Sequence, residues 1–290
     1  MNEVIILGTR INSTTSAELE KKIEKALDGG RLVMAKSNSE FLLRACRDIL
    51  FQKVLNMCDE NIPDGRGILW VAKYLTLPIS SSKFFRPAQA IWQMVYSGAA
   101  IVINPKYITY PLTENIPGVE ALKLMLEVAN KSESKVFFFG ATQSDLDASI
   151  NNIKKEMPHL NIVGSLNGYD FQKNKTIDPV MVINKSKADM LIVALGSPFQ
   201  EFWIQENIDK LSNVRVAVGE GGSLAFISGS QKRAPKWMQQ LGLEWLWRLF
   251  TNRSLTHQTG SRLKRVWNAV PVFIYEVVKL KIRYGATEVK

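Results

Sequence analysis

The 290-residue sequence contains little cysteine or histidine, with two of each. Cys46 and Cys58 lack metal-ligand spacing and cannot form a disulfide framework, so a reducing compartment is expected. His159 and His257 lie far apart, and neither has a partner at the spacing of a metal site or of a Ser/His/Asp set. The sequence therefore predicts no metal site and no disulfide scaffold.

Long apolar runs are also missing. The best candidate for a membrane span, residues 267–280, is short and contains Asn268, Pro271 and Glu276, so no spanning helix is expected. The first four residues carry no basic n-region, so no signal peptide is expected. The Rossmann dinucleotide fingerprint and the Walker motif are absent, which disfavours a soluble NAD- or nucleotide-binding oxidoreductase.

Positive charge is present, and it is concentrated at one end. The whole chain carries a net charge of +10, of which residues 232–290 hold +9, with twelve Lys/Arg and three acidic residues. Residues 1–231 have an ordinary globular composition and are almost neutral. We therefore expect a core over 1–231 and a basic appendage over 232–290 that suits an anionic partner, either nucleic acid or a membrane surface.

The appendage is rich in tryptophan, and basic Trp-rich amphipathic segments lie well in a lipid headgroup region. Two alternatives are a C-terminal helix pair packed on the core and a nucleic-acid-binding element on a non-catalytic α/β domain. We favour the membrane because the tryptophans lie beside leucines in helical register. The candidate contacts to acceptor and membrane are Trp245, Trp247, Arg253, Arg262, Lys264 and Arg265.

In the core, short apolar strands alternate with amphipathic helices, which predicts an α/β fold with a parallel sheet and helices on both faces. Strands are expected at 4–7, 32–35, 136–139, 161–163, 190–194 and 214–218. Helices are expected at 16–27, 39–51, 67–75, 118–129, 146–157, 177–185 and 200–210. A turn is expected at 61–65. Residues 80–111 read as an insertion with an amphipathic helix at 88–96 that carries Ile91, Trp92 and Val95.

Candidate chemistry lies at the strand ends, where parallel sheets bind ligands. Asp64 is either a general base that projects into the cleft or an ordinary turn residue. In the segment 196–201, backbone N–H groups could attract phosphate, whereas Ser197 could simply cap the following helix. Gly140, Gly219 and Gly221 would allow close backbone approach.

Taken together, these residues resemble the WecG/TagA/CpsF glycosyltransferase family over roughly residues 4–267. Three of the motifs that carry the resemblance lie in the core and two in the appendage. The motifs are Pro63-Asp64-Gly65, Pro117-Gly118, Gly196-x-Pro198-x-Gln200-Glu201, Arg233-Ala234-Pro235 and Leu243-Glu244-Trp245.

The resemblance implies a Rossmann-like core and an inverting, metal-independent transfer that uses no cofactor. The donor would be a UDP-sugar and the acceptor a polyprenyl-diphosphate-linked sugar in cell-surface polysaccharide or teichoic acid synthesis. Asp64 and Gln200 are the implied catalytic residues. The implied donor site comprises Asn38, Gly140, Gly196, Gln200, Glu201, Gly219, Gly221, Arg233 and Arg248.

The resemblance also implies a cytoplasmic enzyme, peripheral on the inner face of the cytoplasmic membrane, that self-associates and binds no nucleic acid. The sequence departs from the family pattern at three positions near the expected cleft. Lys36 stands where a Thr is common, Asn115 where an Arg is frequent, and Ala225 where an Asp is usual. These departures leave the donor sugar and the acceptor glycan open.

Overall fold

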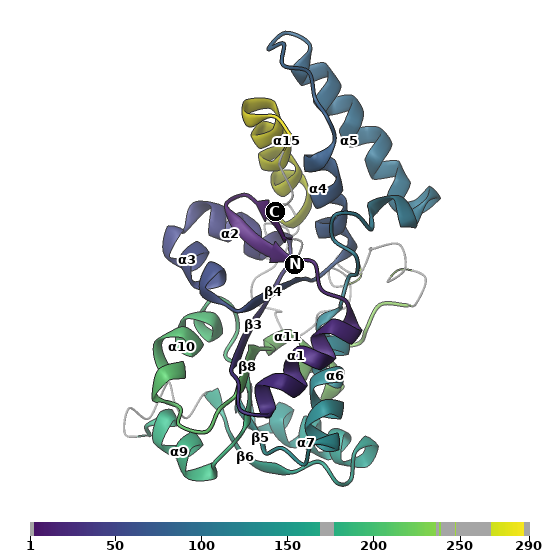
Figure 1. The fold of residues 1–290 in the computed structure, drawn as a ribbon. Coiled ribbons are helices and arrows are strands. Elements are labelled where there is room, and N and C mark those ends of the chain that lie inside the picture. Colours follow the sequence, from purple (N-terminus) through teal and green to yellow (C-terminus); the bar gives the residue numbers. More distant parts are fainter. Residues whose placement is uncertain (1–2, 169–176, 236–237, 239–246, 248–267, 287–290) are drawn as a thin grey trace, which may run out of the picture.

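A computed structural model describes residues 3–168, 177–235, 238, 247 and 268–286. Its centre is a six-stranded sheet in which every neighbouring pair is parallel, as the sequence predicts (Figure 1). The strand order is β4-β3-β8-β7-β5-β6. The strands are β3 (Leu32–Ser37), β4 (Glu60–Pro63), β5 (Val136–Gly140), β6 (Ile162–Leu166), β7 (Met190–Ala194) and β8 (Val216–Gly219).

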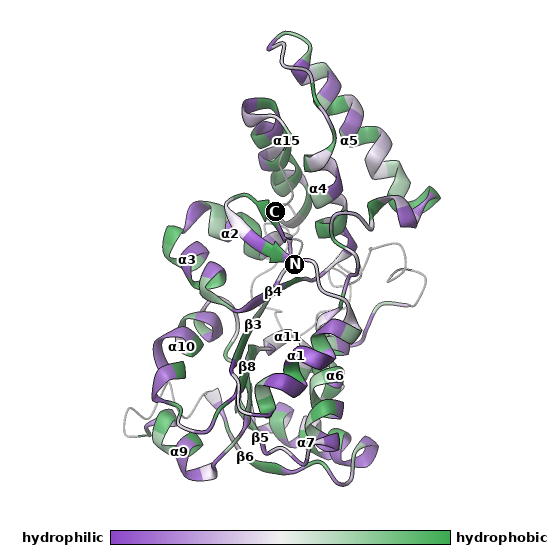
Figure 2. Cartoon of the chain, in the orientation of Figure 1, coloured by the Kyte–Doolittle hydropathy of each residue, from purple (hydrophilic) through white to green (hydrophobic). Residues whose placement is uncertain are grey.

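Side chains alternate between the two faces of the sheet and build two separate cores. In β5, Val136 and Phe138 pack on one face, and Phe137 and Phe139 on the other. The first face is covered by α1 (Ser16–Leu27), α6 (Gly118–Lys131), α7 (Gln143–Glu156) and α11 (Gly221–Ile227). The second is covered by α3 (Ile49–Met57), α9 (Pro179–Ser186) and α10 (Phe199–Asn207). The inner strands β5, β7 and β8 accordingly contain apolar residues and glycine alone, whereas the edge strand β4 includes Glu60 and Asn61 (Figure 2).

A third apolar cluster forms a lobe beyond the β4 edge of the sheet (Figure 1). It joins an antiparallel hairpin to a group of helices. The elements of this lobe are β1 (Glu3–Ile6), β2 (Thr9–Asn12), α2 (Ser39–Arg47), α4 (Arg66–Thr76), α5 (Arg86–Ile103), a 3₁₀ turn (Pro105–Ile108) and α15 (Phe273–Tyr284). Since α4 begins directly after the Pro63-Asp64-Gly65 turn, the lobe is built onto the predicted catalytic segment.

The C-terminal helix α15 is part of this lobe and packs on α2, α4 and α5. Phe273 and Val277 are buried in the apolar cluster. Lys281 is also buried; its ammonium group donates a hydrogen bond to the carbonyl oxygen of Tyr74, and burial lowers its pKa to about 7. Most of 232–267 lies outside the described residues, so the division at residue 232 stays a prediction.

Two local predictions are wrong. Residues 39–51 do not form one helix, because Asp48 ends α2 and caps α3 by accepting hydrogen bonds from the N–H groups of Leu50 and Phe51. Residues 61–63 of the turn expected at 61–65 belong to β4, the edge strand beside β3. The helix expected at 88–96 is present as α5, which is longer at both ends. Strand β2 and helix α11 were not predicted.

Candidate active site

A pocket of about 340 Å³ opens at the carboxyl edge of the sheet, where the ends of β3, β4, β7 and β8 meet. After the neighbouring strands β3 and β8 the chain continues to helices on opposite faces of the sheet, α3 on one face and α11 on the other, and such a switch point is where open α/β sheets bind ligands. The volume lies within the range of ligand pockets, about 300–1,000 Å³. The predicted residues that line the pocket are Asn38, Asp64, Gly196, Gln200, Gly219, Gly221 and Arg233.

Two predicted donor residues do not line the pocket. Gly140 lies where β5 approaches β7: a Cβ there would come within 2.4 Å of the backbone carbon of Ala194. Glu201 is buried behind the pocket wall, and burial raises its pKa. Gly140 thus allows the close approach of β5 and β7, and Glu201 accepts a hydrogen bond from the Gln200 amide. The predicted contact of both residues with the donor stays untested.

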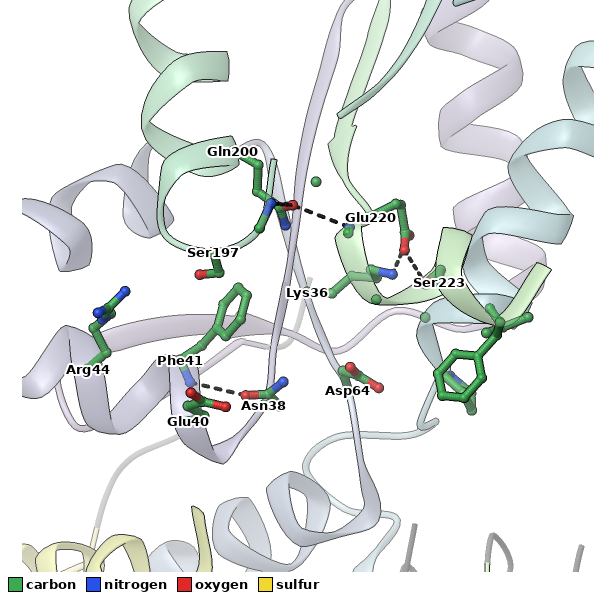
Figure 3. A pocket seen from close by; sticks show the side chains of 18 of the residues that line it. Lys36, Asn38, Glu40, Phe41, Arg44, Asp64, Ser197, Gln200, Glu220 and Ser223 are labelled. Carbon is green, nitrogen blue, oxygen red and sulfur yellow. Dashed lines mark hydrogen bonds and ion pairs between the residues drawn. The ribbon is translucent and has the colours of Figure 1, made fainter. Parts of the chain in front are cut away.

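Asp64 is held by its backbone. Its N–H donates to the carbonyl of Ser37 at 3.0 Å, and the next N–H, that of Gly65, donates to Asn115 Oδ1 at 2.5 Å. Gly65 has a φ of 112°, a conformation that glycine adopts readily, and it starts α4. These bonds turn the Asp64 carboxylate toward the pocket, where it is half-buried (Figure 3). The carboxylate lines the pocket, and no hydrogen bond or ion pair joins it to another described residue.

Asn38 faces Asp64 from the end of β3 (Figure 3). Its Oδ1 accepts a hydrogen bond from the Phe41 N–H at 3.1 Å and so caps α2. The cap uses the carbonyl side of the amide, which leaves the NH₂ group for a ligand in the pocket. One side chain can therefore both start α2 and bind substrate.

Gln200 joins two loops of the pocket wall. Its Oε1 accepts hydrogen bonds from the N–H groups of Gly196 and Gly221, both at 3.2 Å, and its Nε2 donates to Glu201 at 2.7 Å. A Cβ on Gly219 would lie 2.5 Å from Nε2, so this glycine makes room for the amide. The contacts give Gln200 a positioning role, and its direct role in catalysis stays a prediction.

The Gln200→Ala variant should lower the free energy of unfolding by about 2 kcal/mol, because two backbone N–H groups lose their acceptor. It should also raise the donor KM more than it lowers kcat. Chemical denaturation measures the change in stability, and steady-state kinetics measures KM and kcat. Gln205→Ala, on the same helix, removes only a 3.5 Å contact to the Cys58 sulfur and serves as the control. Normal stability with a loss in kcat alone would instead favour the catalytic role.

A buried ion pair that the sequence analysis missed lies at the base of the pocket. Lys36, at the end of β3, pairs with Glu220, at the end of β8, and the hydroxyl of Ser223 donates a hydrogen bond to the same carboxylate (Figure 3). Burial raises the pKa of Glu220, and the Lys36 charge opposes that rise. A Cβ on Gly118 would lie 2.7 Å from the Lys36 nitrogen, so Gly118 leaves space for the pair.

Cationic groups line the rim of the pocket. Arg233 pairs with Glu120 at 3.1 Å, and its Nε is buried without an acceptor among the described residues. Arg44 of α2 also lines the pocket and was not predicted. Guanidinium groups suit phosphate oxygens, so this rim can hold an anionic ligand.

The remaining predicted residues belong to the appendage, and one of them is described. Trp247 is described, and its indole N–H donates to the Lys232 carbonyl at 3.0 Å. The other predicted appendage residues, Trp245, Arg248, Arg253, Arg262, Lys264 and Arg265, lie outside the described residues. Their contacts with donor, acceptor or membrane stay predictions.

The sheet, the pocket at its switch point, the half-buried Asp64 carboxylate and the arginine rim define a Rossmann-like α/β enzyme with a site for an anionic ligand. The family model of the "Glycosyl transferase WecG/TagA/CpsF family" matches residues 4–83 and 80–287. The chain belongs to this family, as its motifs indicate, and is a glycosyltransferase.

Curated relatives named "N-acetylglucosaminyldiphosphoundecaprenol N-acetyl-beta-D-mannosaminyltransferase" are similar to the chain. The protein from Bacillus spizizenii is 34% identical over 201 residues, which is 69% of this chain and 70% of the relative. That from Bacillus subtilis is 34% identical over 174 residues, 60% and 63% of the two chains. That from Staphylococcus aureus strain NCTC 8325 is 30% identical over 188 residues, 65% and 69% of the two chains.

Proposed function

We propose that the enzyme transfers an N-acetylhexosaminyl group, of the N-acetylmannosamine type, from a UDP-sugar to a polyprenyl-diphosphate-linked sugar. The relatives' names support the transferred group and the lipid-diphosphate acceptor. The observation that carries the proposal is the Asp64 carboxylate, which faces a pocket rimmed by Arg44 and Arg233. Synthesis of teichoic acid or another surface polysaccharide is the corresponding role.

The proposed step is a single in-line displacement. Asp64 takes the proton from an acceptor hydroxyl while that oxygen attacks the anomeric carbon from the face opposite UDP. The bond between this carbon and the diphosphate oxygen breaks, and UDP leaves with the electron pair. Arg233 and Arg44 offset the charge that develops on the diphosphate. An inverting transfer from an α-linked UDP-sugar gives a β-linked product, which agrees with the relatives' names.

The donor nucleotide, the independence from metal and the absence of a cofactor are parts of the proposal. Asp145 and Asp147 form a D-x-D sequence, which in many nucleotide-sugar enzymes holds a divalent metal, but both lie near the start of α7 and outside the pocket lining. There Asp145 accepts hydrogen bonds from Thr142 and Ser228. These contacts support a structural role for Asp145.

The location is also proposed: the inner face of the cytoplasmic membrane, where a polyprenyl-linked acceptor would be met. No helix among the described residues combines the length and apolarity needed to cross a bilayer. Self-association remains part of the same proposal.

A donor screen tests the function. The protein is incubated with a short-chain N-acetylglucosaminyl-diphospholipid and a panel of UDP-sugars, with and without EDTA. We expect acceptor-dependent UDP release from UDP-N-acetylmannosamine, a product heavier by one N-acetylhexosamine, and no effect of EDTA. NMR of the product should show a β linkage. No release from any donor would contradict the proposal, and a loss of release in EDTA would contradict metal independence alone.

A further inference from the structure

Helix α5 departs from the usual pattern of a surface helix, because its outer face is apolar and its inner face buries polar side chains beside the apolar Ala90 and Met94. The face that packs on α4 carries Gln93 and Ser97, both buried. Gln93 donates a hydrogen bond to the Pro78 carbonyl at 2.6 Å, and the Trp70 indole donates to the Ser97 hydroxyl at 2.9 Å. Polar contacts therefore hold the inner face of α5 in place.

The outer face of α5 is an exposed apolar stripe. Its residues recur at helical spacing and so lie on one side of the helix: Ile91, Trp92, Val95, Tyr96, Val102 and Ile103. Trp92 is 66% exposed and Ile103 is 80% exposed. At the N-terminal end of the helix, Phe84 and Phe85 are 83% and 64% exposed. The helix projects from the lobe (Figure 1), and hydrophobic residues lie along it (Figure 2).

The charge around the stripe is mostly positive. Residues 65–113 contain no Asp or Glu and five basic residues, among them the exposed Lys83 and Lys106. Helix α15 packs beside α5 and adds the exposed Arg283, whereas its Lys279 is paired with Glu276 at 3.5 Å. Apolar residues with aromatic rings, flanked by lysine and arginine, are typical of helices that lie in the headgroup region of anionic membranes.

We propose that the apolar stripe of α5, with Phe84 and Phe85, is a membrane-docking surface that enters the interface of an anionic bilayer. A second copy of the chain is less suited to this surface, because pairing two stripes would bring positive charges together. The choice of a bilayer as the partner of the stripe rests in part on the proposed function, in which the acceptor is linked to a lipid. The inner face of α5 packs on α4, which starts next to Asp64, so a docked lobe brings the pocket close to the bilayer.

The test is flotation of the full chain with vesicles of phosphatidylcholine alone or mixed with phosphatidylglycerol. The variant I91S/W92S/V95S should bind the mixed vesicles at least about tenfold more weakly than the natural chain. A matched control, M57S/M181S/V182S, changes apolar residues that lie outside the lobe and should bind normally. Because all of these side chains are at least partly exposed, both variants should fold. Turnover on a short-chain soluble acceptor should be unchanged in both.

A second variant tests the charge. K83E/K106E should also bind the mixed vesicles at least about tenfold more weakly, with a steeper loss at low salt. If I91S/W92S/V95S floats with the vesicles as the natural chain does, the proposal is overturned, and membrane binding would be assigned to residues 232–290. The natural chain could instead fail to bind vesicles and form a dimer that I91S/W92S/V95S disrupts. That result would overturn the proposal and assign the stripe to contact with a second copy of the chain. If the natural chain and all variants lack turnover, while I91S/W92S/V95S and K83E/K106E lose flotation as expected, the proposed function is contradicted but the docking surface is not.

Discussion

The Asp64→Asn variant should lose about 10²–10⁴-fold in kcat and keep nearly normal affinity for UDP. The amide has the shape of the carboxylate but cannot take the acceptor proton. The backbone bonds that shape this turn run from the N–H groups of Asp64 and Gly65, so the substitution leaves them intact. UDP release measures kcat, and calorimetry of UDP binding measures the donor site separately.

The matched control is Glu40→Gln, which makes the same chemical change at another carboxylate that lines the pocket. We expect it to retain kcat to within about tenfold, because Glu40 lies on α2 and not at the Asp64 turn. Near-normal turnover in Asp64→Asn would show that the base lies elsewhere. An equal loss in both variants would assign the effect to the charge of the pocket and not to proton transfer.

The central sheet could be predicted because its strands are short apolar runs that end at glycine or polar turns. Residues 190–194 and 136–139 are strands in the structure, and their ends supply the glycines of the expected ligand edge. The Asp64 turn was identified by its motif, and the structure brings it beside Asn38. The edge strand β4 was missed because the Pro-Asp-Gly signal at its end indicates a turn.

Two features depend on tertiary contacts that no local pattern encodes. Lys36 and Glu220 are distant in sequence and meet because β3 and β8 are neighbours. The amphipathic spacing in α5 was visible, but a sequence alone suggests that an apolar face is buried. In the structure, Gln93 and Ser97 find polar partners on the inner side, and this turns Trp92 outward.

The Lys36→Met variant should lose about 3–5 kcal/mol of unfolding free energy at pH 8, because it leaves the Glu220 carboxylate buried without its cation. The loss should be smaller at pH 5. Burial already raises the pKa of Glu220, and removing Lys36 raises it further. Above the ordinary pKa of 4.5, the folded variant then keeps a proton that the unfolded chain releases. Its stability therefore falls as pH rises, more steeply than that of the natural protein.

The double variant Lys36→Met/Glu220→Gln should recover most of this stability, since no unpaired charge remains and the amide oxygen introduced at position 220 can still accept the Ser223 hydrogen bond. Urea unfolding of the single and double variants at pH 5 and pH 8 completes the cycle. A single variant whose loss is independent of pH would show that packing of the lysine, and not its charge, is responsible. Lys36 stands where the family commonly has a threonine, and the Lys36–Glu220 pair forms part of the pocket. If the double variant regains its stability but prefers a different donor sugar, the pair takes part in donor selection.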